Sequence, residues 1–229
     1  MAEEPWYRRD CELLTASVSE AIKLQPGLRL RDEGGFVGLE GRFDIDHEGQ
    51  VVEAFSVRIQ IAIESPRHPP AVWETGGRIP RVPDPHHVNL RDDSLCVQLE
   101  EAYWFHYPQG LSLAEFLENP LRRHLAGQAT VLRGGQWPDE WSHGDSGRWE
   151  FYREVLETSD PDTLVRLMGR ACRPLTKTYL PCPCGSGRKL RKCHGPTLHK
   201  LQQAPSFEWV RSQFVSPLDA SLPHRAAVR

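Results

Sequence analysis

The sequence predicts an α+β fold: an N-terminal helix, a four-stranded antiparallel meander and C-terminal helices, with a small cysteine-rich segment near the end. Three observations lead to this prediction. A helical apolar pattern comes first, strand-like runs of alternating polarity follow, and helical patterns return only after a long proline-rich loop. Strands and helices therefore fall in separate blocks, whereas a parallel sheet would require them to alternate.

The composition is that of an ordinary globular protein. Of the 229 residues, 26% are charged and 39% are hydrophobic, and the formal net charge is −3. These values exclude the collagenous, fully disordered and strongly basic classes. No segment approaches the roughly 20 apolar residues that cross a bilayer, and the acidic first residues lack the pattern of a signal peptide. We therefore expect a cytoplasmic protein that makes no membrane contact.

The first quarter of the chain carries the N-terminal helix and most of the meander. Apolar residues recur at helical spacing between residues 7 and 22, and Gly27 ends this helix. Strand-like runs then cover residues 28–31, 36–45 and 54–63. In the third run the apolar side chains alternate and would share one face: Phe55, Val57, Ile59, Ile61 and Ile63.

A loop rich in proline separates this region from the later helices. Residues 64–93 contain six prolines and one short strand-like pair, Val72-Trp73, which we expect to form the fourth strand. A loop of this length in a compact chain indicates either a functional or a disordered segment.

Two helical segments follow the loop. Ser112 is placed to cap a helix that reaches Leu125, with Pro120 as a kink or break. A second pattern runs from residue 149 to 172 and is interrupted at residues 159–161. There Ser159 or Asp160 can cap a new helix that has Pro161 in its first position.

The most specific local pattern is a cluster of metal ligands: Cys182, Cys184, Cys193 and His194. Three thiolates and one imidazole complete a tetrahedral zinc site and leave no position for a catalytic water. Disulfide-bonded cysteines would instead be spread through the fold. This segment resembles the SEC-C zinc-binding motif, which implies a structural zinc and an interaction role.

The same region is strongly basic. Nine Lys or Arg residues and no acidic residue lie between residues 166 and 200. This surface is either simply solvated or a docking patch for an acidic partner, protein or nucleic acid.

The larger N-terminal region contains one candidate nucleophile, Cys96. Considered alone, a free cysteine at the start of a strand is more often a small buried apolar residue. Its neighbours in the sequence are distinctive: a Pro66-Arg-His-Pro-Pro-Ala-Val72 turn, then His87-Val-Asn89, then Cys96, and finally Trp104. This order of motifs resembles the ubiquitin-conjugating enzyme family over residues 6–132.

The resemblance implies a role for each matched residue. Cys96 corresponds to the thioester-forming nucleophile, and Asn89 to the amide that supports the loop and stabilises an oxyanion. His87 corresponds to a hydrogen-bonding residue that fixes the loop, and Trp104 to a residue beneath it. Val88 stands where the family has proline, which suits a divergent bacterial branch.

Bacterial relatives of this family are associated with antiphage defence. There the resemblance implies that the C-terminus of a protein modifier or of a nucleotide cyclase is carried to a protein target. A separate activating enzyme would supply the acyl group.

Two further hypotheses remain open. The conjugating-type fold could be a catalytically silent scaffold whose zinc knuckle and basic flank bind a protein or nucleic acid. Alternatively, Cys96 could act as a hydrolase nucleophile with His106 or His124.

The expected domain organisation follows from these segments. It comprises a conjugating-type domain at residues 6–132, a helical connector at 133–177, the zinc knuckle at 178–200 and a loose tail at 201–229.

Overall fold

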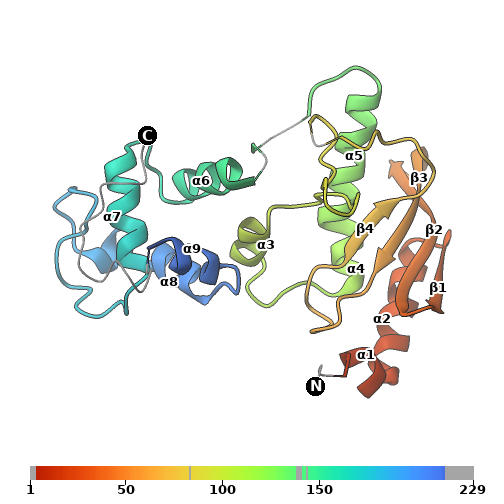
Figure 1. The fold of residues 1–229 in the computed structure, drawn as a ribbon, viewed down its shortest axis with the longest axis horizontal. Coiled ribbons are helices and arrows are strands. Elements are labelled where there is room, and N and C mark those ends of the chain that lie inside the picture. Colours follow the sequence, from red (N-terminus) through yellow and green to blue (C-terminus); the bar gives the residue numbers. More distant parts are fainter. Residues whose placement is uncertain (1–3, 83, 138–140, 143, 215–229) are drawn as a thin grey trace. The chain divides into compact units, whose positions relative to one another are not determined.

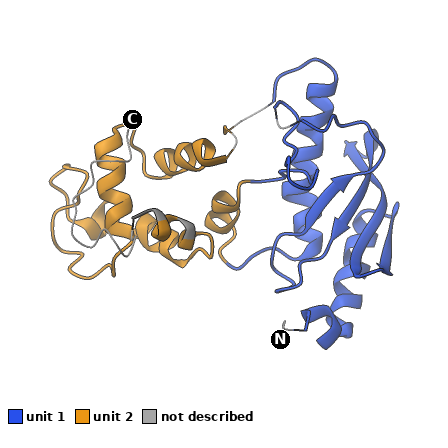
Figure 2. Ribbon diagram, viewed as in Figure 1, with its two compact units in different colours: residues 1–98, 109–140 blue, residues 99–108, 141–229 orange. Residues whose placement is uncertain are grey.

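A computed structural model of the protein describes residues 4–82, 84–137, 141–142 and 144–214. The chain divides into two compact units, shown in two colours in Figure 2. The first comprises residues 1–98 and 109–140, and the second comprises residues 99–108 and 141–229.

The first unit is built on a four-stranded antiparallel meander in the order β1-β2-β3-β4 (Figure 1). The strands are β1 (Leu28–Glu33), β2 (Phe36–His47), β3 (Gln50–Gln60) and β4 (Ala71–Glu74). In this register Leu39 lies opposite Leu30 on one side and Ile59 on the other. The predicted alternation is confirmed from Phe55 to Ile61, whereas Ile63 lies beyond β3 and is 50% exposed. One face of the sheet supplies buried apolar side chains: Val37, Leu39, Phe43, Phe55, Val57, Ile59 and Val72.

Helices of the first unit precede and follow the sheet in sequence. They are α1 (Trp6–Arg9), α2 (Cys11–Leu24), α4 (Leu113–Phe116) and α5 (Arg122–Leu132). The single N-terminal helix expected from the sequence is divided at Asp10, whose side chain accepts a hydrogen bond from Leu13 N at 2.9 Å and caps α2.

The helix expected after Ser112 is present, and it passes Pro120 without ending. Ser112 and Glu115 form a reciprocal capping box, in which the Glu115 carboxylate accepts from Ser112 N at 2.7 Å. A π-helical turn, η1 (Leu117–Leu121), contains Pro120 and joins α4 to α5. The wider turn removes the need for a backbone N–H at the proline, so the chain continues as a helix.

The second unit is helical. It contains α3 (Glu100–His106), α6 (Gly144–Val155), α7 (Pro161–Ala171), the 3₁₀ turn η2 (Leu190–Lys192), α8 (Gly195–Gln203) and α9 (Phe207–Phe214). Asp160 caps α7 by accepting from Thr163 N at 2.9 Å, and Pro161 follows as predicted. Its core is formed by apolar side chains from the helices and from η2: Phe151, Leu156, Leu164, Leu167, Met168, Leu190, Leu198 and Leu201.

Two parts of the second unit differ from the sequence-based division of the chain. Helix α3 was not anticipated, and residues 99–108 group with the second unit although they were assigned to the domain at 6–132. The reason is packing: the Phe105 ring lies 5.6 Å from that of Phe151, and Glu101 forms a buried ion pair with Arg148 at 3.0 Å.

The boundary drawn at residue 201 also falls inside a helix. Residues expected to form a loose tail are helical in α8 and α9 up to Phe214, with Leu201, Phe207 and Val210 buried. The rest of the predicted tail, residues 215–229, lies outside the described part of the chain.

The sheet offers a matched test of how burial varies across one face. Leu39 is fully buried, whereas its cross-strand partner Leu30 is 43% exposed. We predict that Leu39→Ala lowers the free energy of unfolding by about 2–5 kcal/mol, because it removes a buried side chain and leaves a cavity. Leu30→Ala should cost less than half as much. Urea unfolding of both variants measures the difference, and equal losses would contradict the difference in burial between the two leucines.

Candidate metal centre and the Cys96 hairpin

The cysteine-rich segment is folded by short backbone pairings. Cys182 N donates to Arg188 O at 2.7 Å and Leu190 N donates to Leu180 O at 2.8 Å, so the chain returns on itself. The return passes through Gly185 and Gly187, whose φ angles of 80° and 71° lie in the left-handed region that favours glycine. These pairings bring the first two cysteines back to the segment that contains Cys193 and His194.

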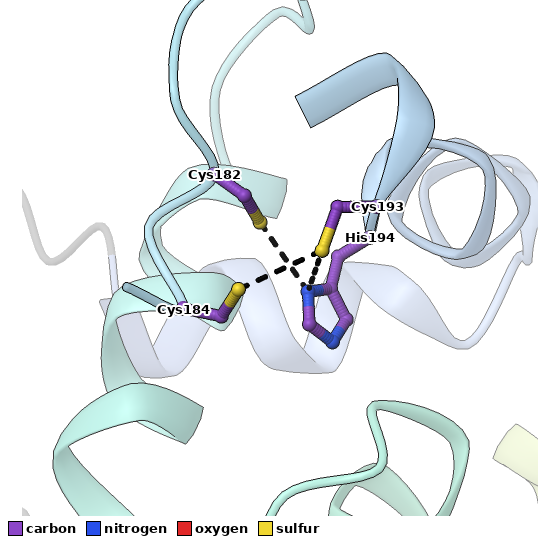
Figure 3. A group of neighbouring side chains, drawn as sticks. All are labelled: Cys182, Cys184, Cys193 and His194. Carbon is purple, nitrogen blue, oxygen red and sulfur yellow. Dashed lines mark hydrogen bonds between the residues drawn. The ribbon is translucent and has the colours of Figure 1, made fainter. Parts of the chain in front are cut away.

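Four potential ligand atoms converge at this turn, as Figure 3 shows. Cys182 Sγ lies 3.3 Å from His194 Nδ1, Cys193 Sγ lies 3.4 Å from the same nitrogen, and Cys184 Sγ lies 3.6 Å from Cys193 Sγ. All four atoms lie within 4.8 Å of one another. The structure therefore brings together the complete ligand set predicted from the sequence.

These separations fit a tetrahedral metal ion. Zn–S bonds of about 2.3 Å and Zn–N bonds of about 2.0 Å place neighbouring ligand atoms about 3.5–3.8 Å apart. The observed separations of 3.3–3.6 Å are close to that range. All four tetrahedral positions are taken by side chains, so a metal held here is structural and activates no water.

The orientation of His194 is set by a neighbour that the sequence did not indicate. Its Nε2 lies 3.0 Å from the carbonyl oxygen of Leu156, just after α6. A carbonyl only accepts, so Nε2 carries the proton and Nδ1 is left with the lone pair that binds metal. Because a backbone carbonyl is present at every residue, no sequence pattern could have identified this contact.

Ser186 is a second contributor that the sequence did not reveal. Its hydroxyl oxygen lies 3.1 Å from Cys184 Sγ and 3.5 Å from Cys193 Sγ. Donation from this hydroxyl lowers the pKa of the Cys184 thiol, whereas burial raises the pKa of Cys182. The Ser186 hydroxyl thus stabilises the thiolate form of a metal ligand.

The surface of the segment is strongly cationic. No Asp or Glu occurs between residues 163 and 207. Seven cations in this range are exposed: Arg166, Arg173, Lys177, Arg188, Lys189, Arg191 and Lys192. Tyr179 and Leu180 are also exposed, although both are largely apolar. The region thus combines positive charge with accessible apolar surface.

Cys96, the candidate nucleophile, lies in a short hairpin of the first unit. Val88 and Leu95 form an antiparallel bridge, flanked by hydrogen bonds from Asn89 N to Ser94 O at 2.8 Å and from Cys96 N to His87 O at 2.6 Å. Leu95 N also donates to Val72 O of β4 at 2.7 Å, which fastens the hairpin to the sheet edge. The predicted site residues His87, Asn89 and Cys96 therefore belong to one paired element.

The predicted site residues flank the bridge between Val88 and Leu95. These two bridged residues are buried, at 2% and 5% exposure, and His87 is also buried. His87 lies opposite Cys96 at one end of the bridge, and Asn89 lies opposite Ser94 at the other.

The turn that closes the hairpin holds the side chain of Asn89. Asn89 Nδ2 donates to Ser94 Oγ at 2.9 Å, and Ser94 Oγ donates to Asp92 Oδ1 at 2.7 Å. Trp73 Nε1 of β4 donates to Asp92 O at 2.9 Å. The Asn89 amide thus uses one of its two N–H groups for a hydrogen bond within the turn.

The environment of Cys96 disfavours the thiolate. The residue is half-buried, and burial raises the pKa of its thiol above the ordinary value of 9.0. No charged group contributes to this shift. At neutral pH Cys96 is therefore a neutral thiol on this hairpin.

The other predicted residues lie in different surroundings. Trp104 is buried on α3 in the second unit, with its ring 5.0 Å from that of Tyr103; its packing beneath the cysteine loop stays a prediction. His106 is also on α3. Burial and the neighbouring His87 ring lower the pKa of His124 to about 3, so His124 is a poor general base near neutral pH.

Comparisons with known proteins identify only the metal-binding segment. Residues 180–196 match the SEC-C motif, which is a metal-binding motif. Neither the curated proteins nor the solved structures include a significant match to the chain. The resemblance of residues 6–132 to conjugating enzymes thus rests on the motifs in this sequence. Among the described residues, no helix combines the length and the apolar character that crossing a bilayer requires.

The ligand set predicts the outcome of removing a single thiol. Cys184→Ser should reduce the bound metal from one equivalent per chain to nearly none, because three ligands no longer close the tetrahedron. Cys172→Ala, in the same unit but outside the cluster, should retain the metal. Elemental analysis of the purified variants measures both, and full metal content in Cys184→Ser would contradict the assignment.

Proposed function

We propose that this protein is a ubiquitin-conjugating-like acyl carrier that forms a thioester at Cys96 and transfers the acyl group to a target. The observation that carries the proposal is the hairpin, which unites His87, Asn89 and Cys96 in one paired element fastened to β4. The order of helix, meander, loop and helices agrees with the conjugating-type resemblance.

The proposed reaction is thioester exchange. The Cys96 sulfur attacks the carbonyl carbon of a donor thioester, the bond to the donor sulfur breaks, and the donor leaves as a thiol that takes the proton from Cys96. Because one thioester replaces another, the step needs little driving force. A protein modifier or a nucleotide-cyclase C-terminus is the proposed acyl group, and a separate activating enzyme supplies it, as in bacterial antiphage systems.

The raised pKa of Cys96 supports the role of an acyl carrier rather than that of a hydrolase. A thiol of higher pKa is a poorer leaving group, so its thioester loses the acyl group more slowly. The cost is a smaller thiolate fraction at neutral pH. The thiolate that does form is intrinsically more nucleophilic, which partly offsets this cost.

Asn89 is proposed to stabilise the oxyanion that forms when the thioester is attacked. Its Nδ2 donates one N–H to Ser94 and retains a second N–H. In well-studied acyl-transfer sites, one such donor contributes about 2.7–4 kcal/mol. The proposed role of His87 is to fix the loop, because its carbonyl oxygen accepts from Cys96 N.

We further propose that the metal at the knuckle is zinc. The three thiolates and one imidazole are ligands that zinc prefers, and the ligand separations agree with its bond lengths. The residues that hold it are Cys182, Cys184, Cys193 and His194. Its contribution is to staple the turn.

The acyl-carrier proposal predicts a covalent adduct in cells. The wild-type chain, isolated at acidic pH without reductant, should carry a protein on the peptide containing Cys96, and a thiol reagent should release it. Cys96→Ala should carry none. Cys96→Ser should carry an ester that resists thiols, because an oxygen ester exchanges with thiols far more slowly. Mass spectrometry identifies the modified peptide.

The exposed Cys11 provides the matched control for this experiment. Cys11→Ala should retain the adduct. An adduct that persists unchanged in Cys96→Ala would remove the acyl-carrier proposal.

The cationic surface favours a second candidate function, a scaffold that binds an acidic partner through the knuckle. Seven exposed cations occur in a range without a single acidic residue. Such a surface attracts polyanions through counterion release and charge steering.

Salt dependence tests this second function. Binding to a short single-stranded DNA and to polyglutamate should weaken steeply with salt. Replacing both Arg191 and Lys192 by Gln should reduce the logarithmic salt slope for DNA by about 2. Arg123→Gln, an exposed cation on α5, should leave the slope unchanged. Fluorescence anisotropy measures both, and affinity that is insensitive to salt would contradict this function.

A further inference from the structure

A buried glutamine on α5 contacts the chain just before the hairpin. Gln128 is fully buried, and its Nε2 donates to the carbonyl oxygen of His86. Its Oε1 lies 3.3 Å from His86 Nδ1; a carbonyl oxygen only accepts, so His86 donates. The nitrogen and the oxygen of the Gln128 amide therefore both hydrogen-bond to His86. The carbonyl oxygen of the next residue, His87, accepts a hydrogen bond from Cys96 N.

The remaining donor of Gln128 joins a second histidine to this contact. Gln128 Nε2 lies 3.2 Å from His124 Nε2, one turn earlier on α5. An amide NH₂ group only donates, so His124 Nε2 accepts and its proton is on Nδ1. Burial keeps His124 neutral down to about pH 3, so this arrangement persists across the range in which a cysteine titrates.

An aromatic side chain covers the group. The Trp137 ring lies 4.4 Å from the His87 ring and 5.1 Å from the His124 ring. A Cβ at Gly127 would lie 2.9 Å from Trp137 Cζ2, so only glycine leaves room for the indole there. Gln128 thus bonds in a closed, dehydrated environment, where a hydrogen bond is electrostatically stronger than in water.

The backbone of His87 requires such support. Its φ of 47° lies in the left-handed region, which a histidine adopts at a cost. A strained residue persists only where its surroundings hold it. Here the ring is held by Trp137, and the preceding carbonyl is held by Gln128.

We propose that Gln128 is a positioning residue for Cys96, because it fastens the His86–His87 backbone to α5 and thereby holds the Cys96 thiol in its half-buried position. The chain of contacts is continuous: Gln128 Nε2 to His86 O, then one peptide unit, then His87 O to Cys96 N. The effect of Gln128 on acyl transfer rests on the proposed function of Cys96. The tether, meaning the hydrogen bonds from Gln128 to His86 and from Cys96 to His87, does not depend on that function.

The test is alkylation of Cys96 by iodoacetamide, followed peptide by peptide with mass spectrometry over a range of pH in the full chain. In the wild type, the midpoint of the rate should lie above that of an exposed cysteine, because burial raises the pKa of this thiol. Gln128→Met keeps the size of the side chain and removes the tether. It should lower the midpoint by about one unit and so raise the rate near neutral pH about tenfold.

Two variants make the test specific. Thr130→Val removes a hydroxyl from the exposed side of the same helix and should leave the Cys96 midpoint unchanged. His86→Ala removes only the bond from His86 Nδ1 to Gln128 Oε1 and should give a smaller shift in the same direction. Alkylation of Gln128→Met at all cysteines alike would be the behaviour of an unfolded chain. In that case His86→Ala decides the test, because His86 is only half-buried and its replacement disturbs the core less.

An unchanged Cys96 midpoint in a folded Gln128→Met chain would overturn the inference, as would an unchanged midpoint in His86→Ala when Gln128→Met is unfolded. Because alkylation needs no acyl donor, the readout is separate from the proposed function. If the midpoint depends on Gln128 but Cys96 carries no adduct in cells, the positioning role of Gln128 stands and the acyl-carrier proposal is wrong. If Cys96 carries an adduct but the midpoint does not depend on Gln128, the acyl-carrier proposal stands and the positioning role is wrong.

Discussion

The convergence of three thiols and one imidazole is the constraint on which the C-terminal segment depends. Residues 178–195 bury few side chains of their own, chiefly Cys182 and Leu190, and they carry exposed cations that repel one another. A segment of this kind cannot offset its loss of conformational entropy by apolar burial. A metal held by the four ligands would supply the missing free energy, as it does in other small metal-stapled modules.

The position of the ligands extends this effect beyond the turn. His194 immediately precedes α8, and its Nε2 contacts the carbonyl oxygen of Leu156 at the end of α6. A metal bound at Nδ1 therefore joins the knuckle, the start of one helix and the end of another. The same imidazole acts as ligand and as connector, so the folding of the knuckle is coupled to the packing of the helices around it.

The first unit holds its own loop by hydrogen bonds. There the hairpin at residues 87–96 is fixed by backbone bonds to β4 and by a buried amide from α5. Such bonds specify position strongly, because a buried polar group that loses its partner incurs the full desolvation cost. Each unit thus contains an irregular segment that buries few apolar side chains. The knuckle is fixed by its metal ligands, and the hairpin is fixed by hydrogen bonds.

Local patterns predicted much of this architecture. The alternation from Phe55 to Ile61 identified a half-buried strand, and Asp160-Pro161 identified the start of α7, because each depends only on residues nearby in the sequence. The ligand set was also readable, since all four residues lie within a short segment.

Features set by tertiary contacts were not readable. Helix α3 is too short for a clear periodic pattern, and its membership of the second unit depends on Phe105 meeting Phe151. Pro120 was predicted to be a kink or break, but the chain passes it in a π-helical turn without ending the helix. Gln128 gave no signal at all, because a polar residue in a helix looks solvent-exposed until the structure shows what it contacts.

The surroundings of Cys96 bear on whether His124 could serve a hydrolase. A cysteine hydrolase needs a nearby base to form the thiolate and then to activate water. His124 does not meet this need, because its pKa is about 3 and its Nε2 already accepts from Gln128. A half-buried thiol of raised pKa, on a hairpin braced from two sides, is suited to accept an acyl group by exchange and to keep it from water. The raised pKa of Cys96 and the lowered pKa of His124 therefore agree with the proposed carrier, which needs no base to accept an acyl group by exchange.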